Sequence, residues 1–176
     1  MILDIEEQTH GYRNGHQLLT STIKLSKSDQ DLIDRLSDIA GAIRPGELFS
    51  PYITAYPLPS NIYYVFAKTW QDVDAPRAGC VLTRSLIIQI SEWESLTDLN
   101  ELYRMLIPVS NDKSNAIFKT KDSYELLPPV EDHRIVELVE AMFLEGRQPI
   151  VYFEAPEAEI IARRILLALW PSIRKN

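Results

Sequence analysis

The chain has 176 residues, of which 45% are hydrophobic and 24% charged, a composition typical of a single globular domain and not of a disordered or collagen-like chain. One cysteine, Cys80, and three histidines exclude a disulfide framework and Cys-rich zinc sites. The net charge of −7 disfavours binding to nucleic acids or anionic membranes, because both require clustered Lys and Arg side chains.

The first predicted element is a β-hairpin. Residues 1–5 form an apolar first strand, and residues 17–25, rich in Leu, Thr and Ile, form the second. The connecting segment contains Asn14-Gly15, and an Asn-Gly pair favours a hairpin turn because both positions tolerate positive φ. A helix follows, with Ser28 as its N-cap candidate and its end at Gly41.

The middle of the chain predicts a second hairpin and a second helix. Residues 44–60 hold four prolines and predict a loop with at most a short strand near 52–56. Residues 62–70 and 80–90 are rich in β-branched and aromatic side chains and predict two strands that pair in antiparallel fashion. The helix after them begins at Ser91 or Ser95 and stops before Pro108.

The last third predicts an α-β-α order after a polar loop with a short strand at 116–119. A helix capped by Asp132 ends at Gly146, a short buried strand covers residues 149–153, and a final helix runs from Pro156 to Trp170. The fold class we predict is therefore a single α+β domain over residues 1–176, with an antiparallel or mixed sheet and three to four helices.

The first hairpin supplies the first candidate site, which comprises His10, Tyr12, Arg13 and His16. Two imidazoles and a guanidinium beside a glycine-rich turn suit a carboxylate or phosphate ligand, although residue types alone equally fit a solvent-exposed turn. A metal site would need further ligands at suitable spacing, which the sequence lacks. Cys80 begins an apolar strand, where a free cysteine is usually a core residue and not a nucleophile.

Arg84 is the second candidate, because strand alternation places it on the same side as Leu82, Leu86 and Ile88. A guanidinium on an apolar face must be paired or line a pocket. The alternatives are an ion pair with an aspartate such as Asp38, a strand end that turns toward solvent, and a ligand- or partner-binding role shared with Arg77 of the preceding loop.

The final predicted helix is apolar on nearly all sides after Arg164. Such a helix is either central to the core or covered by something outside this chain. We therefore expect an interface there, with the candidates Ile161, Ile165, Leu169 and Trp170. An acidic stretch at 122–145 and a basic one after residue 163 suit complementary protein contacts.

Three blocks resemble the N-terminal domain of bacterial GTPase-associated proteins, the large companion proteins of NTP-dependent conflict, or defence, systems. The blocks are residues 10–19 (His-Gly-Tyr-Arg-Asn-Gly-His-Gln-Leu-Leu), residues 36–41, and residues 69–70 with 77–83. The resemblance spans about residues 8–90 and implies an adaptor that couples a GTPase or ATPase regulator to an effector within a longer protein. One departure is Arg84, where the resemblance implies a histidine.

The leading hypothesis is thus a cytoplasmic protein-interaction module, without metal or cofactor, that binds an NTPase, an effector or both, its oligomeric state left open. No apolar run reaches about 18 residues, so we expect no membrane span. The alternative is a small-ligand sensor or enzyme in which His10, Arg13, His16, Arg77 and Arg84 surround one cleft.

Overall fold

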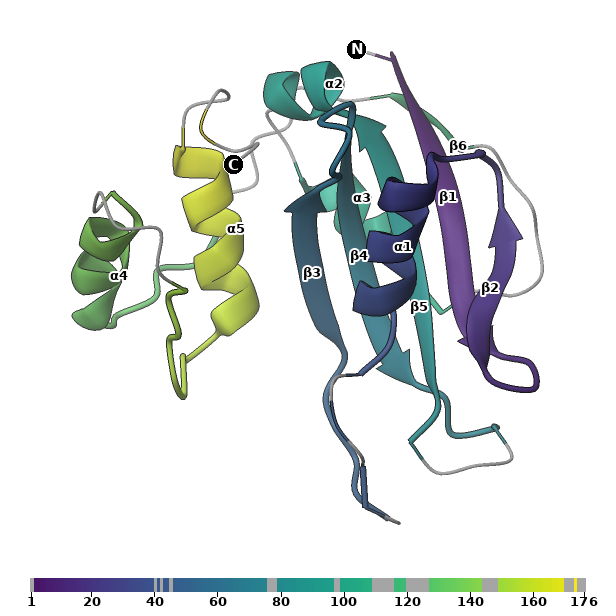
Figure 1. The fold of residues 1–176 in the computed structure, drawn as a ribbon. Helices are drawn as coiled ribbons and strands as arrows, with labels where there is room; N and C mark the ends of the chain where they lie inside the picture. Colours follow the sequence, from purple (N-terminus) through teal and green to yellow (C-terminus); the bar gives the residue numbers. More distant parts are fainter. Residues whose placement is uncertain are drawn as a thin grey trace.

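The structure is a computed structural model that describes residues 2–39, 41, 43–44, 46–75, 79–96, 99–108, 116–119, 127–143, 149–169 and 173. An antiparallel sheet forms its centre, with the strand order β2-β1-β5-β4-β3 (Figure 1). These strands are β1 (Ile2–Tyr12), β2 (His16–Ser21), β3 (Tyr52–Pro57), β4 (Tyr63–Gln71) and β5 (Val81–Gln89). A further strand, β6 (Ala116–Lys119), pairs with the first residues of β1.

Five helices lie within the described ranges: α1 (Lys27–Leu36), α2 (Ile90–Ser95), α3 (Asn100–Met105), α4 (Arg134–Met142) and α5 (Ala158–Ala168). The helix α1 covers one face of the sheet, α2 and α3 cover the other, and α4 and α5 stand beside the β3 edge (Figure 1). The predicted α+β class with an antiparallel sheet is confirmed, with five helices where three to four were expected.

Strand alternation divides the central strand β5 between the two faces. Ile87 packs with Ile33 of α1 on one face, whereas Leu86 and Ile88 pack with α2 and α3 on the other. Because β5 is paired on both sides and covered on both faces, seven of its nine residues are buried. Val81, Leu86, Ile87 and Ile88 are buried for this reason, and the polar residues Thr83, Arg84 and Ser85 between them are buried as well.

The first hairpin forms as predicted, with a longer first strand and a shorter second strand. β1 and β2 pair from Gln8–Ser21 to Tyr12–His16 around a three-residue turn. Asn14 and Gly15 in that turn have φ angles of 60° and 133°, the region that an Asn-Gly pair tolerates best. A β-bulge lies between Thr9 and His10 and shifts the register.

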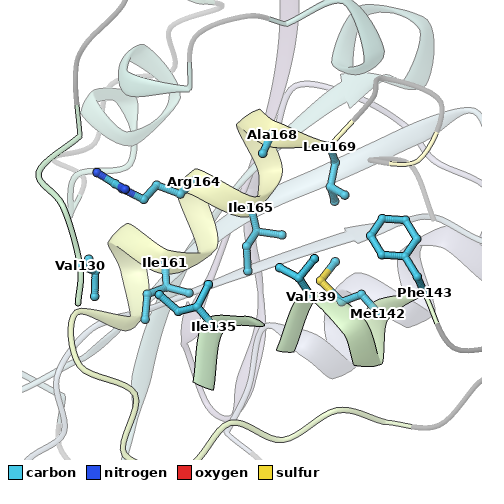
Figure 2. Close-up of a pocket in the computed structure, with 10 residues that line it drawn as sticks. All are labelled: Val130, Ile135, Val139, Met142, Phe143, Ile161, Arg164, Ile165, Ala168 and Leu169. Atoms are coloured by element: carbon cyan, nitrogen blue, oxygen red, sulfur yellow. The ribbon is translucent and has the colours of Figure 1, made fainter. Parts of the chain in front are cut away.

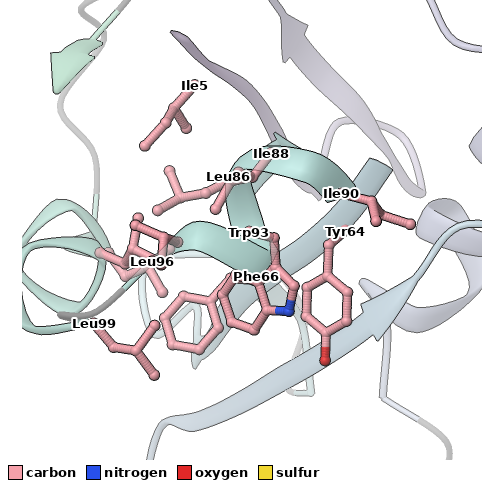
Figure 3. Packing of buried hydrophobic residues seen from close by; sticks show 11 residues of the cluster. Ile5, Tyr64, Phe66, Leu86, Ile88, Ile90, Trp93, Leu96 and Leu99 are labelled. Carbon is pink, nitrogen blue, oxygen red and sulfur yellow. The ribbon is translucent and has the colours of Figure 1, made fainter. Parts of the chain in front are cut away.

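The larger core cluster is built around Trp93 of α2, which is fully buried. Its ring stacks on Tyr64 with centroids 4.2 Å apart and an interplanar angle of 8°, and Phe66 packs at 6.1 Å (Figure 3). Burial raises the pKa of the Tyr64 hydroxyl to about 12. Leu166 and Leu167 of α5 pack against the same cluster, so the last helix is attached to the core.

Three predicted elements differ from the structure. The predicted helix after Ser91 is split into α2 and α3 by Leu96, whose ψ of 126° is extended. The predicted buried strand at 149–153 is wrong, because these residues form no strand and Phe153 is 76% exposed. The N-cap of α1 is Ser26 and not Ser28, since the Ser26 hydroxyl accepts a hydrogen bond from the Asp29 backbone N–H at 3.2 Å.

Candidate functional site

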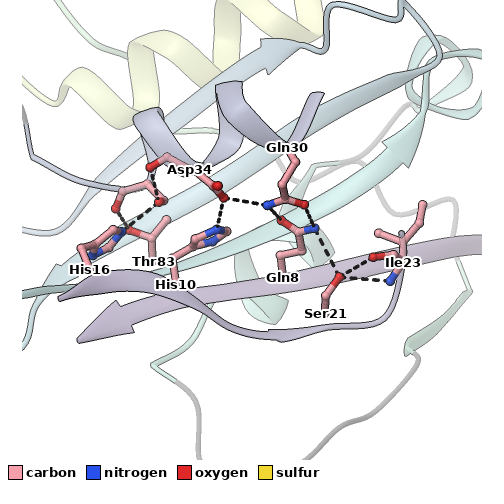
Figure 4. A network of polar contacts seen from close by, with 9 residues as sticks. Gln8, His10, His16, Ser21, Ile23, Gln30, Asp34 and Thr83 are labelled. Atoms are coloured by element: carbon pink, nitrogen blue, oxygen red, sulfur yellow. Dashed lines mark hydrogen bonds and ion pairs between the residues drawn. The ribbon is translucent and has the colours of Figure 1, made fainter. Parts of the chain in front are cut away.

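A polar network lies between the sheet and α1, with Gln8 and His10 buried and Asp34 exposed at its rim (Figure 4). Gln8 of β1 and Gln30 of α1 exchange amide hydrogen bonds of 2.8 and 3.1 Å. The Gln30 amide also donates to Asp34 Oδ1 at 2.7 Å, and that oxygen lies 2.8 Å from His10 Nε2. The network joins α1 to β1, because the buried side chains of Gln8 and His10 both find hydrogen-bond partners on the helix.

His10 is the most buried ionisable group of this network, with no solvent-exposed surface. Burial lowers the pKa of its imidazole, and the hydrogen bond and negative charge of Asp34 oppose this only in part. We assign the proton to Nε2, which faces the Asp34 carboxylate. The other nitrogen, Nδ1, is then an acceptor that meets no hydrogen-bond donor among the described residues.

His16 stacks beside His10, with ring centroids 6.1 Å apart and planes 17° from parallel. Its Nε2 lies 2.9 Å from the hydroxyl of Ser37, which in turn donates to the Asp34 carbonyl oxygen at 2.9 Å. The Ser37 carbonyl accepts a 2.6 Å hydrogen bond from Thr83 of β5. The two histidines of the first hairpin are therefore joined to α1 and to the sheet by one chain of hydrogen bonds.

Beside His16 is a small pocket of about 220 Å³, whose lining includes Tyr12, Asp38 and Cys80. It could hold a small polar group, but no group of three or more His, Cys, Asp or Glu side chains in the described part of the chain is arranged to hold a metal ion. Arg13 lies exposed in the hairpin turn and does not line this pocket. Arg77 lies outside the described residues.

The sequence reasoning missed the α1 half of this network. Gln30, Asp34 and Ser37 recur at the helical spacing i, i+4, i+7 and so share one face of the helix region. That polar stripe beside the buried Ile33 was the available signal, and it pairs with the alternating polar residues Gln8 and His10 of β1.

Arg84 lies on the opposite face of the sheet and does not join the histidines. His10 is opposite Thr83 in the β1–β5 register, whereas Thr9 is opposite Arg84. The Arg84 guanidinium donates to both carboxylate oxygens of Glu7 at 2.9 and 2.7 Å, and both side chains are about nine-tenths buried. Arg84 thus has the carboxylate partner that its position on an apolar face required, and that partner is Glu7, not Asp38.

The interface candidates on α5 lie at an apolar groove of about 440 Å³ between α4 and α5 (Figure 2). Ile161 is buried, Ile165 and Leu169 are half-buried, and all three line the groove; Trp170 lies outside the described residues. Nine of the ten lining side chains are apolar, and the tenth is Arg164, which donates to the carbonyl oxygens of Leu127 and Pro128.

Contacts of the Arg134 guanidinium hold the segment that connects α4 to α5. Arg134 donates to Asp132 Oδ2 at 2.7 Å and to the Phe153 carbonyl at 3.1 Å, and its guanidinium lies 4.7 Å from the Tyr152 ring centroid. The hydrogen bonds from Arg134 hold the pKa of the Asp132 carboxyl well below its usual range. Asp132 also accepts from the Arg134 backbone N–H at 2.9 Å, but the N-cap of α4 is His133, without a side-chain capping hydrogen bond, so the cap was predicted one residue too early.

Comparison with known proteins gives one family match. Residues 4–106 match the family described as GTPase-associated protein 1, N-terminal domain type 1. The match covers more than half of the chain, runs from β1 through α3, and includes the three blocks that carried the resemblance. No curated protein and no solved structure matches significantly. Among the helices of the described ranges, none has the length and apolar character needed to cross a membrane.

Proposed function

The chain belongs to the family of type 1 N-terminal domains of GTPase-associated protein 1, and from this premise we propose that it is a protein-interaction adaptor. It couples an NTPase regulator to an effector within a cytoplasmic bacterial conflict system. The regulator that we expect is a GTPase. In this role residues 1–176 act as the N-terminal module of a longer protein.

The observation that carries this proposal is the apolar groove between α4 and α5. Val139 and Met142, each 38% exposed, and Phe143, 59% exposed, leave apolar surface in contact with solvent along one side of it. Contiguous exposed apolar surface of this kind is typical of protein-binding sites. The helices that form the groove follow the region matched by the family, so the proposed binding surface lies outside the matched residues.

Co-purification tests the proposal. The tagged chain is expressed together with the GTPase and the effector candidates encoded next to its gene, and retained proteins are identified by mass spectrometry. We expect the GTPase to be retained by the wild-type chain and lost with Val139→Asp, which places a carboxylate in the groove.

The matched control for this experiment is Val73→Asp, which introduces the same change at a 74% exposed position in the β4–β5 loop. The proposal is contradicted if the wild-type chain retains none of the GTPases and effectors that are encoded next to its gene. Equal loss with both variants would also contradict it, because the groove would then not be the binding surface.

A second candidate function, a small-ligand sensor or enzyme, is supported by the pocket beside His16. Its ligand would be a carboxylate or phosphate small enough for about 220 Å³, bound through Tyr12 and His16. Arg84 has no part in it, since it pairs with Glu7 on the other face of the sheet. Titration calorimetry with inorganic phosphate and with acetate, on the wild-type chain and on His16→Ala, measures such binding directly.

A further inference from the structure

We propose that the groove between α4 and α5 binds a basic amphipathic α-helix of a protein partner, an inference that rests on the proposed adaptor function. Two helices form the groove, and their apolar side chains point toward one another across it (Figure 2). The chemistry of the partner follows from the spacing of these side chains, from the surface they leave exposed, and from the charge around them.

The spacing fits a helix. On α4 the lining residues Ile135, Val139 and Met142 recur at intervals of four and three, and on α5 Ile161, Ile165 and Ala168 recur at the same intervals. Side chains at this period form ridges and grooves along a helix surface, into which the ridge of a third helix packs. A helical ligand presents its anchors at i, i+3 or i+4, and i+7, which is the same period.

The groove is only partly covered. Its lining residue Ile161 is 4% exposed, whereas Val139, Met142 and Phe143 on the α4 side keep between 38% and 59% of their surface in solvent. α4 has no buried residue at all, although its apolar residues follow the helical period. A third apolar helix in the groove would cover the exposed lining residues of α4 and those of α5 together.

The charge around the groove selects a basic partner. Glu131 and Glu140 are exposed next to the lining residues Val130 and Val139, and neither forms an ion pair with a described residue. The nearby guanidiniums are already engaged, because Arg134 binds Asp132 and Arg164 binds backbone carbonyls. A second copy of this chain that docked through this same face would place like charges against each other, and an anionic lipid surface would be repelled.

Two synthetic peptides test the proposal on the full 176-residue chain. Both carry leucine at the same helical positions, and one has lysines on the flanks while the other has glutamates. Fluorescence anisotropy of the labelled peptides should give an affinity about tenfold higher for the lysine peptide at low salt, and the ratio should shrink at high salt. Glu140→Lys should reduce that ratio, and Val139→Asp should abolish binding of both peptides, whereas Val73→Asp should change neither.

Each other outcome overturns a distinct statement. Equal affinity for the two peptides, with loss in Val139→Asp, overturns the basic partner and leaves the adaptor proposal intact. Binding of neither peptide overturns the helical partner, and GTPase co-purification then decides the adaptor function separately. Dimerisation of the wild-type chain that Val139→Asp abolishes, measured by analytical ultracentrifugation, would make a second copy the occupant and also overturn the proposal. Circular dichroism of each variant confirms that the fold is retained.

Discussion

Replacing Arg84 by methionine tests whether its ion pair with Glu7, on the face of the sheet covered by α2 and α3, is structural. The change removes the cation that contacts both carboxylate oxygens of Glu7, while the Glu7 side chain stays only 11% exposed. Breaking a buried pair by removing one partner costs about 3–5 kcal/mol. Lys68, opposite Arg84 on β4, keeps one cation on this face and places the expected cost in the lower part of that range.

The reverse single variant, Glu7→Leu, should cost a similar amount, because it leaves a buried guanidinium without its carboxylate. The double variant Arg84→Met/Glu7→Leu places two apolar side chains in the same space. It should recover most of the loss, because apolar replacement of a buried pair is often neutral or stabilising. The deviation from additivity should therefore exceed about 2 kcal/mol.

Urea denaturation followed by tryptophan fluorescence and circular dichroism measures these differences, since Trp93 is buried in the native chain and reports its exposure on unfolding. For a domain of this size, a loss of about 3–5 kcal/mol lowers the melting temperature by roughly 6–20 °C. A cost below about 1 kcal/mol for Arg84→Met, or additive single effects, would refute the reasoning. The double variant should also keep every partner that the wild type binds, as a purely structural pair requires.

Three further predictions concern the core, the buried histidine and the first turn. Trp93→Ala should reduce the free energy of unfolding by about 3–5 kcal/mol in urea followed by circular dichroism, because it removes the ring stacked on Tyr64; a loss below about 1 kcal/mol would contradict this. Because burial lowers the pKa of His10 below its ordinary value of 6.5, the unfolded chain binds more protons just below that pH. The free energy of unfolding should then fall as the pH drops through 6.5 toward the lowered pKa, and His10→Gln should have a shallower slope; identical slopes would show that His10 is not responsible. Gly15→Ala should cost about 1–3 kcal/mol, because φ at this position is 133°, and an unchanged melting temperature would count against a required positive φ.

Local patterns were sufficient for the two hairpins. The Asn14-Gly15 turn and the β-branched and aromatic side chains of β4 and β5 are features of neighbouring residues, and both hairpins formed. The short strand at 116–119 was also predicted, but its partner was not. It pairs with residues 2–5 of β1, a contact between distant segments that no local pattern specifies.

The predicted long helix failed for a geometric reason. Trp93, Leu96, Leu99 and Leu102 are all buried in one cluster and are spaced by three residues. In a continuous α-helix each step of three falls about 60° short of a full turn, so Trp93 and Leu102 would point in nearly opposite directions. The extended residue Leu96 interrupts the helix and lets all four side chains reach the same core.

The predicted strand at 149–153 failed because a strand needs a neighbouring edge. Its residues are apolar and β-branched, but Val151 and Phe153 are 65% and 76% exposed and pair with no strand. Arg134 instead holds this segment through the Phe153 carbonyl. For the candidate site, alternation correctly placed Arg84 on an apolar face, but the choice of Glu7 as its partner depends on the β1–β5 register.

The position of β1 also determines when the sheet can be completed during synthesis. Glu7 and Arg84 are 77 positions apart, so at typical translation rates β1 leaves the ribosome roughly 4–15 s before β5 does. Within that interval its only available strand partner is β2 of the local hairpin. Residues 2–5 of β1 stay without their partner strand for longer still, until Ala116–Lys119 has been synthesised. The nascent chain therefore carries an unpaired strand edge through much of its synthesis, and chaperone occupancy at that stage should bear directly on its yield.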